Sequence, residues 1–230
     1  VNGQKTILHL LPSGILNTES VCVIGPGVVV NPTVLLKEMN QLKEQGLTCD
    51  HLKISDRAHL LMPYHVRLDE LIEARGGKYK IGTTKNGIGP CYADKYSRVG
   101  LRVCDLVDWD VFEEKLRSVL PVKNDEITKV YGGEPFDLEE MIEQFRQIRE
   151  WLAPMVVDSI DLIDRYLRED KMVLFEGAQA NMLDINYGTY PFVTSSSPTS
   201  AGVCEGAGVA PQKLDRIIGI VKAYASRVGE

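Results

Sequence analysis

Short apolar runs alternate with segments of helical pattern through the first third of the chain. The run VCVIGPGVVV (21–30) is apolar enough for a buried strand, and residues 31–46 follow with the pattern of a helix. Residues 51–60 predict a second strand and residues 62–77 a second helix. Strands that alternate with helices favour parallel pairing, because each helix carries the chain back across the sheet. We therefore expect an α/β fold with a largely parallel central sheet, flanking helices and long ligand-binding loops.

Local signals set the limits of the two helices. Asn31 is a typical N-cap, and Gly46 follows the first helix where a stop is needed. In the second helix the predicted apolar positions are Val66, Leu68, Leu71 and Ile72. In the rest of the chain we predict strands at 5–16, 171–177 and 216–224. We also predict helices at 107–120, 136–152 and 155–170. The stretch from about 107 to 170 is thus mainly helical.

Two long segments lack a sustained period and are rich in Gly and polar residues. They are residues 76–100 and the part of 173–203 that follows an apolar run. In the second segment Gln179 offers an amide, and Thr189 and residues 194–197 offer hydroxyl groups. Such groups suit a neutral heterocycle and phosphate oxygens, and ligands in α/β folds bind where strands run into loops. From composition alone, an ordinary surface loop remains open as the alternative.

Composition excludes several classes of protein. The chain has 230 residues, a net charge of −6 and a pI near 5.4, which argues against sequence-independent nucleic-acid binding. No apolar stretch approaches the roughly 20 residues that span a bilayer, and the first residues do not resemble a signal peptide, so we expect a cytoplasmic protein with no membrane partner. The five cysteines lack paired spacing, which favours reduced thiols. The four histidines lie in separate segments and predict no metal site.

Four stretches of the chain resemble the adenylosuccinate synthetase family. They are ILHLLPSGIL (7–16), IGTTKNGIGPCYADKYSRVGLRV (81–103), FEGAQANMLDINYGTYPFVTSS (175–196) and VKAYASRVG (221–229). The resemblance implies a GTP-dependent C–N ligase of purine biosynthesis that joins IMP and L-aspartate through a 6-phosphoryl-IMP intermediate. It further implies Mg²⁺ as cofactor and a homodimer.

The resemblance also implies an IMP site. By motif it comprises Thr84, Arg98, Gln179 and Thr194, with Arg98 reaching the nucleotide of the partner subunit. Threonine hydroxyls can bind phosphate oxygens, arginine can pair with a phosphate, and an amide can bind the purine or its ribose. Lys95 and Arg102 flank Arg98 and suit either this site or the dimer surface equally well. For Asp184 we expect an exposed loop carboxylate rather than an orienting group.

Some motifs of the family have no counterpart in the chain. The sequence contains no GDEGKGK phosphate loop, no N-A-G-H-T stretch and no G-x-x-x-x-G-K-[ST]. We therefore expect residues 1–230 to be the central part of one α/β synthetase domain, a fragment that is inactive alone, with no catalytic residue or metal ligand of its own. The Mg²⁺ ligands are expected in the N-terminal segment that the resemblance implies. The alternatives are a non-catalytic module that binds purine nucleotides or scaffolds a dimer, and a flavodoxin-like signalling domain.

Overall fold

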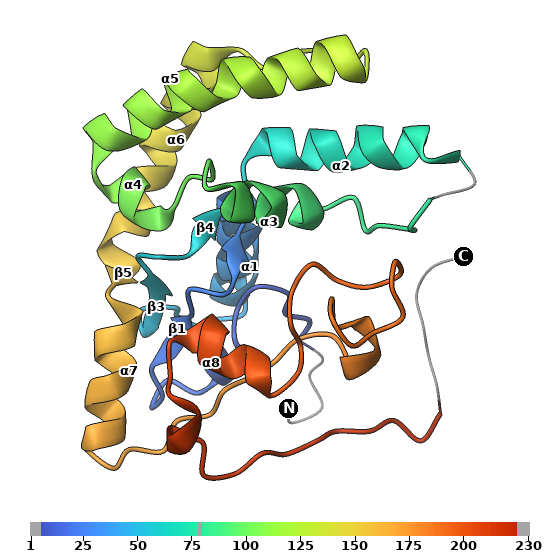
Figure 1. The fold of residues 1–230 in the computed structure, drawn as a ribbon. Coiled ribbons are helices and arrows are strands. Elements are labelled where there is room, and N and C mark those ends of the chain that lie inside the picture. Colours follow the sequence, from blue (N-terminus) through green and yellow to red (C-terminus); the bar gives the residue numbers. More distant parts are fainter. Residues whose placement is uncertain (1–5, 78–79, 225–230) are drawn as a thin grey trace.

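The computed structural model describes residues 6–77 and 80–224 and contains a small parallel sheet at its centre (Figure 1). Strands β1 (Cys22–Ile24), β3 (Leu52–Ser55) and β5 (Val156–Val157) pair in the order β1-β3-β5, all parallel. Strands β2 (Val29–Val30) and β4 (His59–Leu60) form a second parallel pair. The prediction of an α/β fold with a parallel sheet is confirmed.

The sheet residues belong to one hydrophobic core. In the register, Cys22 lies opposite Leu52 and Ile24 opposite Ile54, and all four side chains are buried. The same core includes Phe112 of the helical layer. Parallel strands of this kind are covered on both faces, which fits the apolar character of β1 and β2 and the buried leucine and isoleucine of β3.

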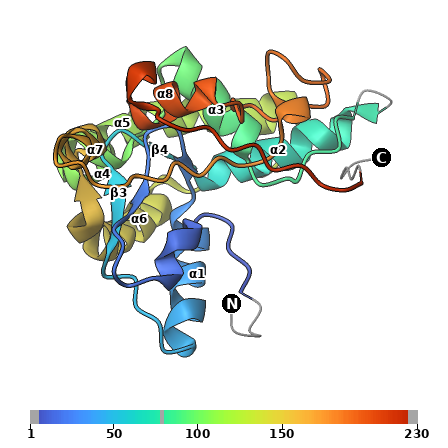
Figure 2. The same ribbon diagram turned by 90° about the horizontal axis from the view of Figure 1, so that it is seen from below.

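Helix α1 (Pro32–Glu44) has the ends that the sequence predicts. The side-chain oxygen of Asn31 accepts hydrogen bonds from the backbone N–H groups of Thr33 and Val34. Gly46 follows the helix with φ +77°, a left-handed conformation that glycine adopts without steric cost. In Figure 2, α1 lies on one side of the strands and α8 (Ala201–Ala207) on the other.

Helix α2 (Pro63–Arg75) differs from its prediction in the face that it buries. Of the predicted apolar positions only Leu68 is fully buried, and Ile72 is 42% exposed. The buried face instead carries three polar side chains, His65, Asp69 and Glu73. These groups find partners that are distant in sequence, which the local apolar pattern could not reveal.

Helix α3 (Ile88–Ser97) lies within a segment that was predicted to be irregular, so that prediction is wrong there. The helix begins directly after Gly87, whose φ is +76°, and ends at Arg98, whose φ is +63°. Because left-handed residues bound it on both sides, the helix is short and surrounded by loop-like sequence. Its glycines and proline hid the helical period.

The helical layer contains α4 (Val103–Val107), α5 (Trp109–Asp125), a π-helical turn at Glu126–Val130 and α6 (Leu138–Leu152). The predictions of helices at 107–120 and 136–152 are confirmed, although α5 runs on to Asp125. In Figure 1 α5 and α6 lie above the strands. Phe112 and Phe145 face each other across the two helices with ring centroids 5.2 Å apart.

The predicted helix at 155–170 begins later than expected, because β5 occupies its first residues. Helix α7 (Ser159–Arg168) starts after Asp158, whose carboxylate accepts from the N–H groups of Ile160 and Asp161. Among the described residues, no helix is long and apolar enough to cross a membrane.

The three remaining strand predictions are wrong for the described residues. Residues 6–12 form no strand and are followed by a short 3-10 turn, Ser13–Leu16. Residues 171–177 and 214–222 run as extended chain with no strand partner in the described part of the protein (Figure 1). Met172 is 99% exposed and Ile220 is 94% exposed. An apolar run of strand length becomes a strand only when another strand pairs with it.

Candidate functional site

The two polar segments meet at the first turn of α3. A side chain built on Gly89 would lie 3.6 Å from Oγ of Ser195, so the loop that carries Thr194 packs against the start of that helix. Thr84 lies in the loop just before the same helix, and Thr84 is exposed. The structure thus brings the Thr194 loop to the first turn of α3, five residues after Thr84.

Helix α2 holds the Thr84 loop at both ends. The N–H of Gly82 donates to Oε1 of Glu73 at 2.9 Å, and the N–H of Gly87 donates to Oδ2 of Asp69 at 2.9 Å. A side chain at Gly87 would lie 2.7 Å from the backbone nitrogen of Val66, so glycine is required there for the loop to approach α2.

Arg98 lies at the opposite end of α3 from Thr84. The helix has 10 residues, which corresponds to about 15 Å along its axis. The guanidinium of Arg98 is exposed and forms no hydrogen bond or ion pair within the described part of the chain. The structure does not bring Arg98 close to Thr84, and its guanidinium is available to an external anion.

A buried ion-pair network fixes α3 beneath Arg98. Nε2 of His65 lies 2.9 Å from Oδ2 of Asp94, and Nζ of Lys123 in α5 donates to the other carboxylate oxygen. Burial raises the pKa of Asp94, but the hydrogen bonds from His65 and Lys123 outweigh it, and the pKa lies below its usual value. Burial lowers the pKa of His65, while the bond to Asp94 acts in the opposite direction. The N–H of Met62 donates to Nδ1 of His65, which fits a neutral ring that donates from Nε2.

The Thr194 loop is organised by Asp184, which is fully buried. Its carboxylate accepts from Oγ of Ser197 at 2.7 Å and from the N–H groups of Asn186 and Tyr187 at 2.8 and 3.0 Å. These hydrogen bonds, that of Ser197 first, lower the pKa of Asp184. The expectation of an exposed loop carboxylate is wrong, because the loop folds back around this side chain. Thr194 is half-buried within the folded loop.

Gln179 lies at the start of the same segment with φ +58°, and its side chain is exposed. Three residues earlier, Oε2 of Glu176 accepts hydrogen bonds from both the N–H and the hydroxyl of Ser13, each at 2.9 Å. This contact anchors the Gln179 loop to the N-terminal part of the chain. No contact joins Gln179 to Thr84 or Arg98 among the described residues.

Of the two flanking cations, Lys95 has side-chain neighbours in the two tyrosines beside it. The ammonium of Lys95 lies 5.6 Å from the ring centroid of Tyr92 and 5.7 Å from that of Tyr96. Arg102 precedes α4, and its N–H donates to Oδ2 of Asp105 at 2.8 Å. These contacts leave both alternatives for the two cations open.

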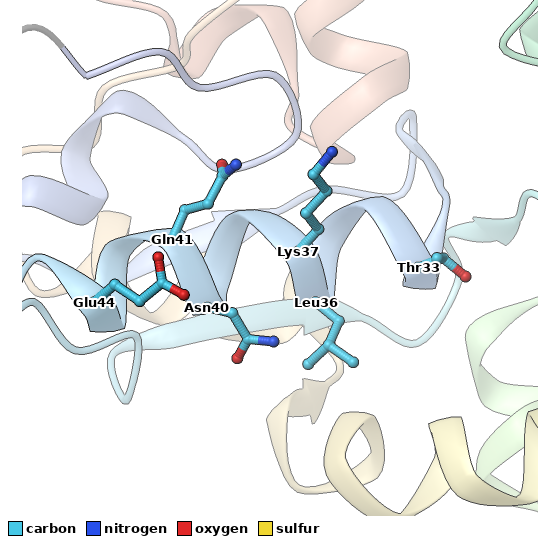
Figure 3. Close-up of a pocket in the computed structure, with 6 residues that line it drawn as sticks. All are labelled: Thr33, Leu36, Lys37, Asn40, Gln41 and Glu44. Atoms are coloured by element: carbon cyan, nitrogen blue, oxygen red, sulfur yellow. The ribbon is translucent and has the colours of Figure 1, made fainter.

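Two surface depressions lie away from these residues. One of about 440 Å³ runs along α1, where Lys37 and Gln41 extend to one side and Leu36 and Asn40 to the other (Figure 3). Another of about 440 Å³ lies between α7 and residues 208–213. Neither is lined by any of the four predicted site residues. The side chains in Figure 3 diverge from one another, so that depression offers no convergent chemistry.

Sequence reasoning missed three of the carboxylates that hold the loops, Asp69, Glu73 and Glu176, and it named the fourth, Asp184, only as an exposed group. For α2 a signal was present, since Asp69 and Glu73 are four residues apart and therefore share one helix face. That spacing is usual on solvated helices too, so it did not reveal their burial.

The whole chain matches one family. The sequence model of adenylosuccinate synthetase matches residues 1–230. The chain belongs to the adenylosuccinate synthetase family. The chain is 55% identical over 230 residues to the adenylosuccinate synthetase of Fusobacterium nucleatum and 54% identical over 228 residues to that of Acetivibrio thermocellus. These alignments cover 100% and 99% of the chain and 54% of each relative.

A solved structure agrees with this assignment. Fully ligated adenylosuccinate synthetase from Plasmodium falciparum matches with a TM-score of 0.91 at 37% identity, over 100% of this chain and 53% of that chain. The family resemblance inferred from the four sequence stretches is therefore confirmed. The chain spans about half the length of the curated relatives it matches.

Proposed function

We propose that the protein carrying this chain joins IMP and L-aspartate at the expense of GTP and so makes adenylosuccinate, the first committed step from IMP to AMP. The observation that carries the proposal is the contact of the Thr194 loop with the first turn of α3, the helix that directly follows the Thr84 loop, in a chain of the adenylosuccinate synthetase family. In the reaction implied by the family, the γ-phosphoryl group of GTP is transferred to O6 of IMP. The amino nitrogen of aspartate then forms a bond to C6, and inorganic phosphate leaves.

Each proposed IMP ligand has a role that fits its chemistry. The hydroxyls of Thr84 and Thr194 donate to oxygens of the IMP phosphate, and the amide of Gln179 binds the purine or ribose. The fixed backbone around these side chains reduces the conformational entropy that is lost when the nucleotide binds. These residues bind and orient IMP and do not themselves transfer a proton.

The family resemblance also implies Mg²⁺ as cofactor. No group of three or more His, Cys, Asp or Glu side chains in this part of the chain could hold a metal ion. The described residues therefore offer no fitting site for the ion. GTP as co-substrate and a cytoplasmic location remain part of the proposal.

Arg98 supports a homodimer as the working form. Arg98 is separated from the Thr84 loop by the length of α3, about 15 Å. This separation disfavours binding of one phosphate by both side chains of the same subunit. In the proposed dimer, Arg98 pairs with the phosphate of the IMP that is bound mainly by the partner subunit. The exposed Tyr96 and Val99 beside it offer apolar surface for the interface.

The activity is tested with purified full-length protein that carries this chain. Absorbance of adenylosuccinate should rise only when IMP, L-aspartate, GTP and Mg²⁺ are all present. If folded protein binds IMP but consumes no GTP, the non-catalytic nucleotide-binding module replaces the synthetase.

The shared site is tested by mixing two impaired variants, Arg98→Leu and Thr194→Ala, at an IMP concentration well below the KM of either variant. Random dimers of equal amounts should regain about a quarter of wild-type activity, because half are mixed and each mixed dimer has one intact site. If Arg98 serves its own subunit, no activity returns. Arg168→Leu, which changes an exposed arginine on α7, is the matched control and should keep full activity.

A further inference from the structure

The buried face of α2 carries a stripe of polar side chains at a spacing of four residues. His65 is 0% exposed, Asp69 6% and Glu73 8%. Residues four apart lie above one another on a helix, so the three groups form a line along its axis. Burial of such groups costs free energy unless each has a partner, and each of the three does.

The partners follow one continuous segment of the chain in the opposite direction. Glu73 accepts from the N–H of Gly82 and Asp69 from the N–H of Gly87, while His65 bonds to Asp94 in α3. The first two contacts bracket Thr84. The contact between His65 and Asp94 lies one turn before Arg98. The backbone carbonyl of Asp94 also accepts hydrogen bonds from the N–H groups of the two residues that follow Arg98.

We propose that His65, Asp69 and Glu73 are positioning residues, which hold the segment 82–98 so that Thr84 and Arg98 are presented correctly to a nucleoside monophosphate. This inference rests on the proposed function for the identity of the ligand. The two carboxylates act through backbone N–H groups and not by contact with the nucleotide, whose phosphate would repel them.

The hydrogen bonds from Gly87 to Asp69 and from Gly82 to Glu73 differ in strength. Gly87 is buried, whereas Gly82 is exposed. Loss of the Asp69 carboxylate therefore leaves a buried N–H without a partner, while water can replace the Glu73 carboxylate at Gly82. Asp69→Ala should disturb the loop more than Glu73→Ala. The amide variants Asp69→Asn and Glu73→Gln retain a carbonyl acceptor of the same shape and should restore much of the effect.

The experiment compares these four variants and wild type with the control Glu70→Ala. Glu70 is exposed on the same helix and pairs with Arg67 at 3.4 Å. Amide hydrogen exchange is measured at Gly82 and Gly87, together with tryptic cleavage after Lys85. In Asp69→Ala, exchange at Gly87 should accelerate by about tenfold or more, since a hydrogen bond to a charged group is lost. Glu73→Ala should accelerate exchange mainly at Gly82, and Glu70→Ala at neither glycine.

Titration with IMP is the second measurement on the same samples. The dissociation constant should rise by roughly fivefold or more in both alanine variants, less in the amide variants and not in Glu70→Ala. Unchanged exchange at Gly82 and Gly87 in folded alanine variants would overturn the positioning role. Faster exchange with unchanged IMP affinity would also overturn it, because the hydrogen bonds of Asp69 and Glu73 would then hold the loop without any effect on nucleotide binding. If wild type fails to bind IMP, the proposed function fails. Amide hydrogen exchange at Gly82 and Gly87 then shows by itself whether Asp69 and Glu73 hold the loop.

Discussion

Replacement of Gly87 by alanine tests how closely the Thr84 loop approaches α2. Gly87 has φ +76°, and an alanine there costs about 1–2 kcal/mol for the left-handed conformation alone. The added methyl group would lie 2.7 Å from the backbone nitrogen of Val66, so the loop must move away. That movement breaks the bond from Gly87 N–H to Asp69, which is worth about 1.5–3 kcal/mol because the acceptor is charged. The two terms together predict a loss of about 2.5–5 kcal/mol in the free energy of unfolding.

Gly46 provides a matched control. Its φ is +77°, and an added Cβ would meet nothing within 4 Å. Gly46→Ala should therefore show only the conformational term, and the effect of glycine on the unfolded chain is the same in both variants. Urea unfolding measures the difference. With an m-value of about 2 kcal/mol/M, the midpoint of Gly87→Ala should lie roughly 1 M below that of Gly46→Ala. Equal midpoints would refute the close approach of the loop to α2.

Three further results are expected. Asn31→Ala removes the acceptor at the start of α1 and should lower the free energy of unfolding by about 1 kcal/mol, measured by urea unfolding. Arg98→Leu should raise the KM for IMP by at least about tenfold, since a charge-assisted contact to phosphate is worth about 1.5–3 kcal/mol; an unchanged KM would remove Arg98 from the site. Burial, aided by Lys95 and Arg102, lowers the pKa of His59 from 6.5 to about 4. As the pH falls, His59 is therefore protonated in the unfolded chain before it is protonated in the folded protein. The free energy of unfolding should decrease as the pH drops from 6.5 towards 4, and His59→Asn should flatten this part of the stability profile.

The sequence predicted elements whose signals are local. The signals for the cap at Asn31, the stop at Gly46 and the helix at 136–152 all lie within the segments that they define, and the structure has each of these features. Periodicity failed where distant partners decide the outcome. Helix α3 starts from Gly87, which Asp69 holds, and the buried face of α2 is polar because its partners lie in another segment.

The candidate site was predicted through family motifs and not through periodicity. Thr84, Gln179 and Thr194 were found because their neighbours in the sequence resemble the family, and their roles as IMP ligands stay predictions. Asp184 could be named from the sequence but not placed, since a carboxylate followed by polar residues is also typical of exposed turns. Its burial depends on how the loop folds back on itself. The division of residues 1–230 as the central part of one domain likewise stays a prediction.

The turn between β1 and β2 touches α8 without any side chain in between. The N–H of Gly27 donates to the carbonyl of Gly206 at 2.9 Å, and a side chain at Gly27 would lie 2.5 Å from Cα of Gly206. This contact joins two residues that are separated by most of the sequence. Contacts of such large sequence separation form slowly, because a long loop must close before they can stabilise the fold. During synthesis, the strands and α1 leave the ribosome long before α8 does. The Thr194 loop, which directly precedes α8, is therefore expected to reach the first turn of α3 among the last events of folding.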